Sequence, residues 1–305
     1  MSHSHGRLHA DNVTLRYDER TISRNLSVSI PDGSFTVIVG PNACGKSTLL
    51  RALSRLLKPS AGQVVLDGKS IADFPAKETA RRLGLLPQSS IAPEGITVAD
   101  LVARGRYPHQ SFLRQWSRAD EEAVIAAMEA TRVTDLSGRP VDELSGGQRQ
   151  RVWIAMVLAQ ETPILLLDEP TTFLDIAHQI ELMDLLADLN GQGRTVVAVL
   201  HDLNHACRYA SHLIAMKDGA TVAEGRPSAI VNERLVEDVF GLPSVIIPDP
   251  VSNTPLIVPK GRKPPANSEI ASPAELLPVA VAGANAATRL NGSGSPHNAQ
   301  EPRHG

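Results

Sequence analysis

A glycine-bounded loop between an apolar segment and a helix-forming segment constrains this chain most. Residues 35–39 are apolar or β-branched and predict a buried strand, while residues 46–57 predict a helix that stops at Lys58 and Pro59. The loop between them fits the pattern G-x-x-x-x-G-K-[ST] and consists of Gly40, Pro41, Asn42, Ala43, Cys44, Gly45, Lys46, Ser47 and Thr48. In such a unit, backbone N–H groups surround phosphate oxygens and the helix N-terminus adds partial positive charge. The pattern therefore predicts an α/β fold that binds a nucleotide.

Three side chains of this loop have expected roles on the phosphates. Lys46 should reach the β- and γ-phosphates, Ser47 should ligate Mg²⁺, and Thr48 should contact the α-phosphate. Cys44 and Cys207 are the two cysteines of the chain, so no disulfide framework is expected. A redox switch is one interpretation of Cys44, and a small side chain that fills the loop is the simpler one.

Polar side chains follow two further apolar strands. Residues 164–167 predict a buried strand that leads into Asp168 and Glu169. Asp168 can hold Mg²⁺ through its water shell, whereas Glu169 can polarise an attacking water. Residues 195–200 predict a second strand that ends at His201, where parallel sheets bind ligands. We therefore expect His201 to contact the γ-phosphate, although a structural histidine is the alternative. For Asp168 and Glu169 the alternative is a solvated acidic turn, and the phosphate loop argues against it.

The other segments predict two additions to this parallel core. Residues 8–17 and 25–30 alternate like strands and predict an N-terminal antiparallel β subdomain. From about 89 to 160 the pattern becomes helical, which predicts an inserted α-helical subdomain. The remaining expected elements are a strand at 63–67, helices at 98–104, 119–131, 146–160 and 176–189, and shorter elements over 212–247. The expected fold class is α/β, with a parallel-sheet core that carries both subdomains.

Composition and charge limit the organisation and the partners of the chain. Residues 8–260 are expected to form one domain, whereas residues 261–305 are rich in Pro, Ala, Asn, Ser and Gly and are expected to be disordered. A net charge of -3 and a pI near 6.4 argue against a nucleic-acid binder. No apolar run approaches the roughly 20 residues that span a bilayer, so any work at a membrane should proceed through a partner.

The segment from Leu144 to Gln148 reads LSGGQ and precedes the strand at 164–167. With it, residues 8–250 resemble the ATP-binding subunits of ABC transporters, which share a P-loop NTPase core. The resemblance implies that Asp168 ends the Walker B strand, that Glu169 is the catalytic base and that His201 is the switch histidine. Lys46 then belongs to the catalytic set as well.

The resemblance also assigns residues outside the core motifs. Gln88 would sense Mg²⁺ and the attacking water at the hinge before the helical block, and Asp175 would lie in the D-loop. Tyr17 would stack on adenine, although a strand-surface tyrosine is the alternative. A second copy or a paralogue would complete a dimer in which each ATP also meets the signature residues of the other chain, which here are Ser145, Gly146, Gly147 and Gln148.

A narrower resemblance concerns the cargo. Residues 96–98, 103–110, 170–175 and 201–206 resemble the ATPases that drive iron(III)–siderophore uptake, of the ferric enterobactin and ferric citrate type. This implies ATP and Mg²⁺ as cofactors, membrane permease subunits as partners, and an extracytoplasmic siderophore-binding protein as an indirect partner. The expected location is peripheral, at the cytoplasmic face of the inner membrane. Haem and vitamin B12 importers are similar, so those cargoes stay open.

Two rival classes fit the sequence less well. A soluble ABC ATPase that acts on ribosomes or DNA usually carries two cassettes or long coiled-coil arms, whereas this chain has one cassette and no heptad run. A catalytically inactive regulatory cassette is disfavoured because Lys46, Asp168, Glu169 and His201 are all present.

Overall fold

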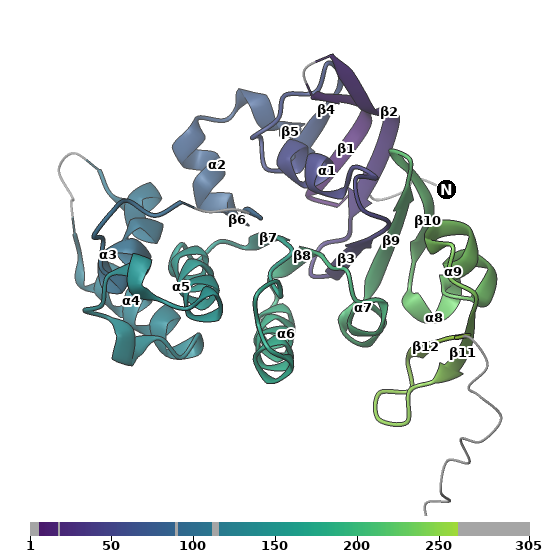
Figure 1. Ribbon diagram of the computed structural model, residues 1–305. Coiled ribbons are helices and arrows are strands. Elements are labelled where there is room, and N and C mark those ends of the chain that lie inside the picture. Colours follow the sequence, from purple (N-terminus) through teal and green to yellow (C-terminus); the bar gives the residue numbers. More distant parts are fainter. Residues whose placement is uncertain (1–5, 18, 89–90, 112–115, 262–305) are drawn as a thin grey trace, which may run out of the picture. The chain divides into compact units, whose positions relative to one another are not determined.

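A six-stranded sheet forms the centre of the described structure (Figure 1). The computed structural model describes residues 6–17, 19–88, 91–111 and 116–261. The strand order is β10-β9-β3-β8-β7-β6, with β3 at Phe35–Val39, β6 at Leu83–Leu86, β7 at Ile164–Asp168, β8 at Thr195–Val199, β9 at His212–Lys217 and β10 at Ala220–Gly225. β10 pairs antiparallel with β9, and the other neighbours pair in parallel. Every residue of β3, β7 and β8 is buried, as strands covered on both faces require. The predicted parallel core is confirmed.

An antiparallel sheet from the N-terminal part packs above the first core helix. Its strand order is β2-β1-β4-β5, with β1 at Leu8–Tyr17, β2 at Arg20–Ile30, β4 at Ala61–Leu66 and β5 at Lys69–Ser70. Helix α1 (Lys46–Leu53) buries Leu49 and Leu50 in a cluster that contains Leu15 of β1 and Leu166 of β7. The helix that follows the phosphate loop is therefore held between the two sheets.

The inserted helical subdomain lies between β6 and β7 in the chain and is confirmed. It contains α3 (Val98–Ala103), the 3-10 segment η2 (Arg104–His109), α4 (Arg118–Ala130), two short 3-10 turns and α5 (Gly146–Ala159). α3, α4 and α5 pack together at one side of the central sheet (Figure 1).

A buried arginine connects three parts of this subdomain. The Arg106 Nε donates to Asp120 Oδ1 at 2.9 Å, and its Nη1 donates to the Ala159 carbonyl and to Glu161, each at 2.7 Å. Asp120 also accepts from Ser117 in the capping box of α4. Burial alone would raise the pKa of Asp120, but the hydrogen bonds from Ser117 and Arg106 hold that pKa below its usual value.

The last part of the described chain is attached to the core through α7. The elements after β7 include α6 (Ile176–Gly191), α7 (Leu203–Tyr209), α8 (Pro227–Ile230), α9 (Glu233–Phe240) and a hairpin of β11 (Ser244–Pro248) and β12 (Pro255–Pro259). The Ile257 amide donates to Asn204 Oδ1 at 2.7 Å, and Arg208 forms an ion pair with Asp249 at 2.6 Å. The Arg208 hydrogen bond lowers the pKa of Asp249 to about 2. The hairpin is thus bonded to α7 at two places.

The structure departs from the sequence expectations at several boundaries. The helix expected to reach residue 57 ends at Leu53, because Arg55 is left-handed with φ 66° and the next turn closes onto the Arg51 carbonyl. Helix α2 (Ala76–Arg82) and strand β6 were not expected. β6 has only four residues and contains Gly84, so its sequence pattern alone does not predict a strand. Its pairing with β7 stabilises it in the structure.

The described residues include no helix long and apolar enough to cross a membrane. The expected disorder of residues 261–305 concerns a segment that, from residue 262 onward, lies outside the described residues.

We expect Arg106→Ala to lower the free energy of unfolding by about 3–5 kcal/mol, because it leaves the buried Asp120 carboxylate without its partner. Urea denaturation followed by circular dichroism measures this change. Arg118→Ala is the control, since its pair with Glu122 is exposed and should contribute less than about 1 kcal/mol. Equal losses for the two variants would contradict the structural role of Arg106.

Candidate nucleotide-binding site

The phosphate loop closes tightly around the Lys46 ammonium. Lys46 is 5% exposed, and its Nζ donates to the Gly40 carbonyl at 2.8 Å and to the Pro41 carbonyl at 2.9 Å. Gly40 has φ 154°, and a Cβ there would lie 2.2 Å from the Met216 carbonyl oxygen, so no other residue fits. Gly45 is also left-handed and precedes the first residue of α1. The loop therefore places a buried cation at the N-terminus of a helix.

The Cys44 side chain is buried inside this loop and is not an exposed thiol. Its side chain is buried, and burial raises the pKa of the thiol although Lys46 partly opposes this. A thiol that is inaccessible and more protonated than usual is a poor target for oxidation. These properties favour the small-side-chain interpretation over the redox switch.

Ser47 and Asp168 together offer two oxygen ligands. The Ser47 Oγ donates to Asp168 Oδ1 at 2.9 Å, and Asp168 is 2% exposed. Burial raises the pKa of Asp168, and the neighbouring Glu169 charge raises it further. A nearby cation would favour the ionised carboxylate, so the pair fits Mg²⁺. Within the described residues no three His, Cys, Asp or Glu side chains form a metal cluster.

Glu169 and His201 contact each other at the carboxyl edge of the central sheet. Their Oε1 and Nε2 atoms are 2.7 Å apart, and the Glu169 side chain is 12% exposed whereas His201 is 47% exposed. Glu169 has φ 53°, a conformation that is uncommon for residues other than glycine, and its amide donates to the Val199 carbonyl. The chain therefore leaves the extended conformation of β7 directly after Asp168. Backbone strain of this kind is often found at functional sites.

One pocket of about 460 Å³ gathers nine of the expected site residues, whereas Gly40, Pro41, Cys44 and Asp168 are not among its lining residues. Two residues of its lining, Arg20 and Ile22, were missed because they carry no motif and because β2 begins at Arg20, before the strand expected at 25–30. The expected residues that line the pocket are Asn42, Ala43, Gly45, Lys46, Ser47, Thr48, Gln88, Glu169 and His201. The phosphate loop, Gln88, Glu169 and His201 thus meet in one cavity of the size that ligand pockets have.

Tyr17 lies next to this pocket but is not among its lining residues. It ends β1, its side chain is about half exposed, and its hydroxyl accepts a hydrogen bond from Arg51 at 3.0 Å. Stacking of Tyr17 on adenine stays a prediction.

The signature residues form a separate surface of the same chain. Ser145 caps α5, where its Oγ accepts from the Gln148 amide and its own amide donates to Gln148 Oε1. Gly146 and Gly147 form the first turn beside Phe173, and Asp175 caps α6. None of the signature residues nor Asp175 lines the 460 Å³ pocket in the described structure.

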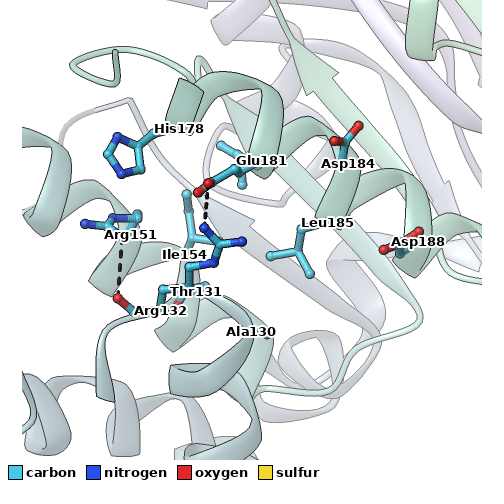
Figure 2. Close-up of a pocket in the computed structure, with 11 residues that line it drawn as sticks. Ala130, Thr131, Arg132, Arg151, Ile154, His178, Glu181, Asp184, Leu185 and Asp188 are labelled. Carbon is cyan, nitrogen blue, oxygen red and sulfur yellow. Dashed lines mark hydrogen bonds and ion pairs between the residues drawn. The ribbon is translucent and has the colours of Figure 1, made fainter. Parts of the chain in front are cut away.

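A second cavity, of about 290 Å³, lies between the end of α4, α5 and α6 (Figure 2). Arg132 Nη1 and Glu181 Oε1 form an ion pair of 2.5 Å across it, and Arg151 Nη1 donates to the Arg132 carbonyl. The cavity contains no expected site residue. Its lining comes from the end of α4, from α5 and from α6, and no phosphate-loop residue belongs to it.

Comparisons with known proteins agree with this geometry. A profile of the ABC transporter family matches residues 23–172. The ferric enterobactin transport ATP-binding protein FepC of Escherichia coli K12 is 58% identical over 88% of this chain and 99% of its own length. The probable siderophore transport system ATP-binding protein YusV of Bacillus subtilis is 55% identical, over 83% of this chain and 92% of its length.

Solved structures show the same fold. An inward-facing transporter described as of metal-chelate type matches with a TM-score of 0.70 and 28% identity, over 83% of this chain and 96% of its own. A dimeric ATP-binding cassette bound to ADP and phosphate after hydrolysis matches with a TM-score of 0.65 and 29% identity, over 72% of this chain and 98% of its own. The chain therefore belongs to the ATP-binding proteins of ABC transporters, and it is an ATPase of that family.

Proposed function

We propose that this chain hydrolyses ATP, as a subunit of an importer, to drive the uptake of iron(III)–siderophores. The single observation that carries the hydrolytic role is the 2.7 Å contact between Glu169 and His201 beside the phosphate loop. The cargo is supported by the high identity to two ATP-binding proteins named for ferric enterobactin and siderophore transport.

Each pocket residue has a separate role in the transfer of the phosphoryl group to water. Lys46 lies on the loop and stabilises charge on the phosphates, and Glu169 accepts a proton from the attacking water. His201 orients Glu169 and contacts the γ-phosphate end. Mg²⁺, held by Ser47 and Asp168 with Gln88 nearby, would neutralise charge on the β- and γ-phosphates. Positioning and electrostatics thus supply the catalysis.

A second ATPase subunit completes each site. Ser145, Gly146, Gly147 and Gln148 open α5, whose N-terminus suits a phosphate, yet they line no part of the chain's own pocket. A head-to-tail pair of identical chains brings these residues and Asp175 to the partner's nucleotide. ATP then joins the two chains, and hydrolysis separates them.

The remaining partners and the location follow from the importer role. Permease subunits in the membrane contact the helical subdomain and the Gln88 region, and an extracytoplasmic binding protein delivers the siderophore to the permease. The chain works as a peripheral protein at the cytoplasmic face of the inner membrane.

Glu169→Gln should lower ATP hydrolysis by about a hundredfold or more while ATP binding is retained, because the amide cannot accept the proton of the water. Phosphate release and equilibrium ATP binding measure the two effects. Gel filtration with ATP should show a dimer of the variant, because the joined state is not hydrolysed. Glu129→Gln, at an exposed position of α4, is the matched control and should hydrolyse normally. Normal turnover by Glu169→Gln would remove Glu169 from the mechanism.

Cells that lack this gene should lose uptake of siderophores loaded with radioactive iron. Wild-type protein should restore uptake, and Lys46→Ala should not, because the loop loses its buried cation. Normal iron uptake in the deletion strain would refute the siderophore cargo. Loss of haem or vitamin B12 uptake in the same strain would then identify the alternative cargo.

A further inference from the structure

His201 lies in a short connection whose two ends are held by different parts of the fold. β8 ends at Val199, and the Leu200 amide donates to the Ile38 carbonyl of β3 at 3.2 Å, so the central sheet fixes the connection at its strand end. At the other end α7 begins at Leu203. The position of His201 therefore depends on where the first turn of α7 lies.

Asp202 joins the residue after His201 to this first turn. Its Oδ1 accepts hydrogen bonds from the Asn204 amide at 2.7 Å and from the His205 amide at 2.9 Å. Such a cap provides partners for N–H groups that the helix itself leaves without one. The start of α7 and the residue beside His201 thus form one hydrogen-bonded unit.

The Asn204 side chain binds this unit to β12. The Ile257 amide donates to Asn204 Oδ1 at 2.7 Å, and Asn204 Nδ2 donates to the Ile257 carbonyl at 3.3 Å. Ile257 is buried, and its side chain belongs to the larger hydrophobic core. Because both bonds end on the backbone of one buried residue, they fix the orientation of the Asn204 amide group as well as its distance from β12.

The contact of His201 with Glu169 is sensitive to small displacements. His201 Nε2 lies 2.7 Å from Glu169 Oε1, and about half of the His201 side chain is exposed, so few packing contacts hold its ring. A shift of about 1 Å would lengthen this contact beyond the range of a hydrogen bond. Any group that holds the first turn of α7 therefore affects the geometry of hydrolysis.

We infer that Asn204 is a positioning residue for His201, because its two hydrogen bonds to the Ile257 backbone let the β11–β12 hairpin hold the first turn of α7 where His201 meets Glu169. This inference rests on the proposed ATPase function. It adds to that function a residue that does not line the nucleotide pocket.

The other attachments of α7 act further from His201. Ala206 and Cys207 are fully buried, and the ion pair of Arg208 with Asp249 binds the last turn of the helix to the hairpin. These contacts hold the body of α7 on the core. Loss of the Asn204 side chain should therefore release the first turn while the helix itself stays folded.

The test is a double-mutant cycle on the full-length chain. Phosphate release from radiolabelled ATP is followed over a range of ATP concentrations, and for hours where turnover is slow, so that the His201→Ala background stays measurable. Asn204→Ala should lower kcat by about three- to tenfold and change KM by less than about twofold, since the lost interaction acts in the transition state. In the His201→Ala background it should lower the residual kcat by less than about twofold, because the group that it positions is absent.

Asn190→Ala is the matched control. The Asn190 Nδ2 also donates to two backbone carbonyls, those of Gly33 at 2.9 Å and Arg194 at 2.8 Å, and Asn190 does not line the nucleotide pocket. This variant should keep the kcat of the wild type. Thermal unfolding of each variant confirms that the chains compared are folded.

Two results would overturn the inference. An equal fall of kcat with and without His201 would show that Asn204 has a merely structural role. An unchanged kcat in Asn204→Ala would show that packing of Ala206 and Cys207 alone fixes the first turn of α7. Failure of the proposed function is distinct, since wild type and Lys46→Ala would then release phosphate at the same rate.

Discussion

The hydrogen bond from Ser47 to Asp168 joins two parts of the fold that are 121 residues apart in the chain. β3 and β7 are not neighbours, because β8 lies between them, so the first turn of α1 must reach across the end of β8. Parallel pairing makes this possible, since it brings the carboxyl ends of the three strands to one edge. Glu169 and His201 share the phosphate pocket for the same reason. The helical subdomain is inserted before β7 and leaves that edge intact.

Much of this arrangement could be predicted because its signals are local. The phosphate loop, the carboxylates after residues 164–167 and the histidine after residues 195–200 each follow a short apolar run, and all three were expected at the same edge. Sequence reasoning was poorest where structure depends on a distant partner. β6 exists through its pairing with β7, and α1 ends early because of a single left-handed residue.

The site shows the same division between local and distant signals. Arg20 and Ile22 carry no motif, and only the approach of β2 to the phosphate loop makes them pocket residues. Tyr17 has the family's aromatic character but sits outside the lining. The signature segment is the reverse case. Its motif is easily recognised and its capping box is formed, yet it does not line the nucleotide pocket of the same chain. Whether a residue lines the pocket of its own chain depends on the fold and not on the local pattern.

The β11–β12 hairpin is bonded to α7, the helix that directly follows a residue of the nucleotide pocket. His201 lies just before Asp202, which caps α7, and the same helix is bonded to the hairpin through Asn204 and through Arg208. Asp249 and Ile257 thus bind the helix that follows His201 in the chain. A fragment that ended after β10 would keep every recognisable motif and lose that support. The packing around α7 therefore extends to β12, beyond the last recognisable motif, and it includes residues that no motif marks.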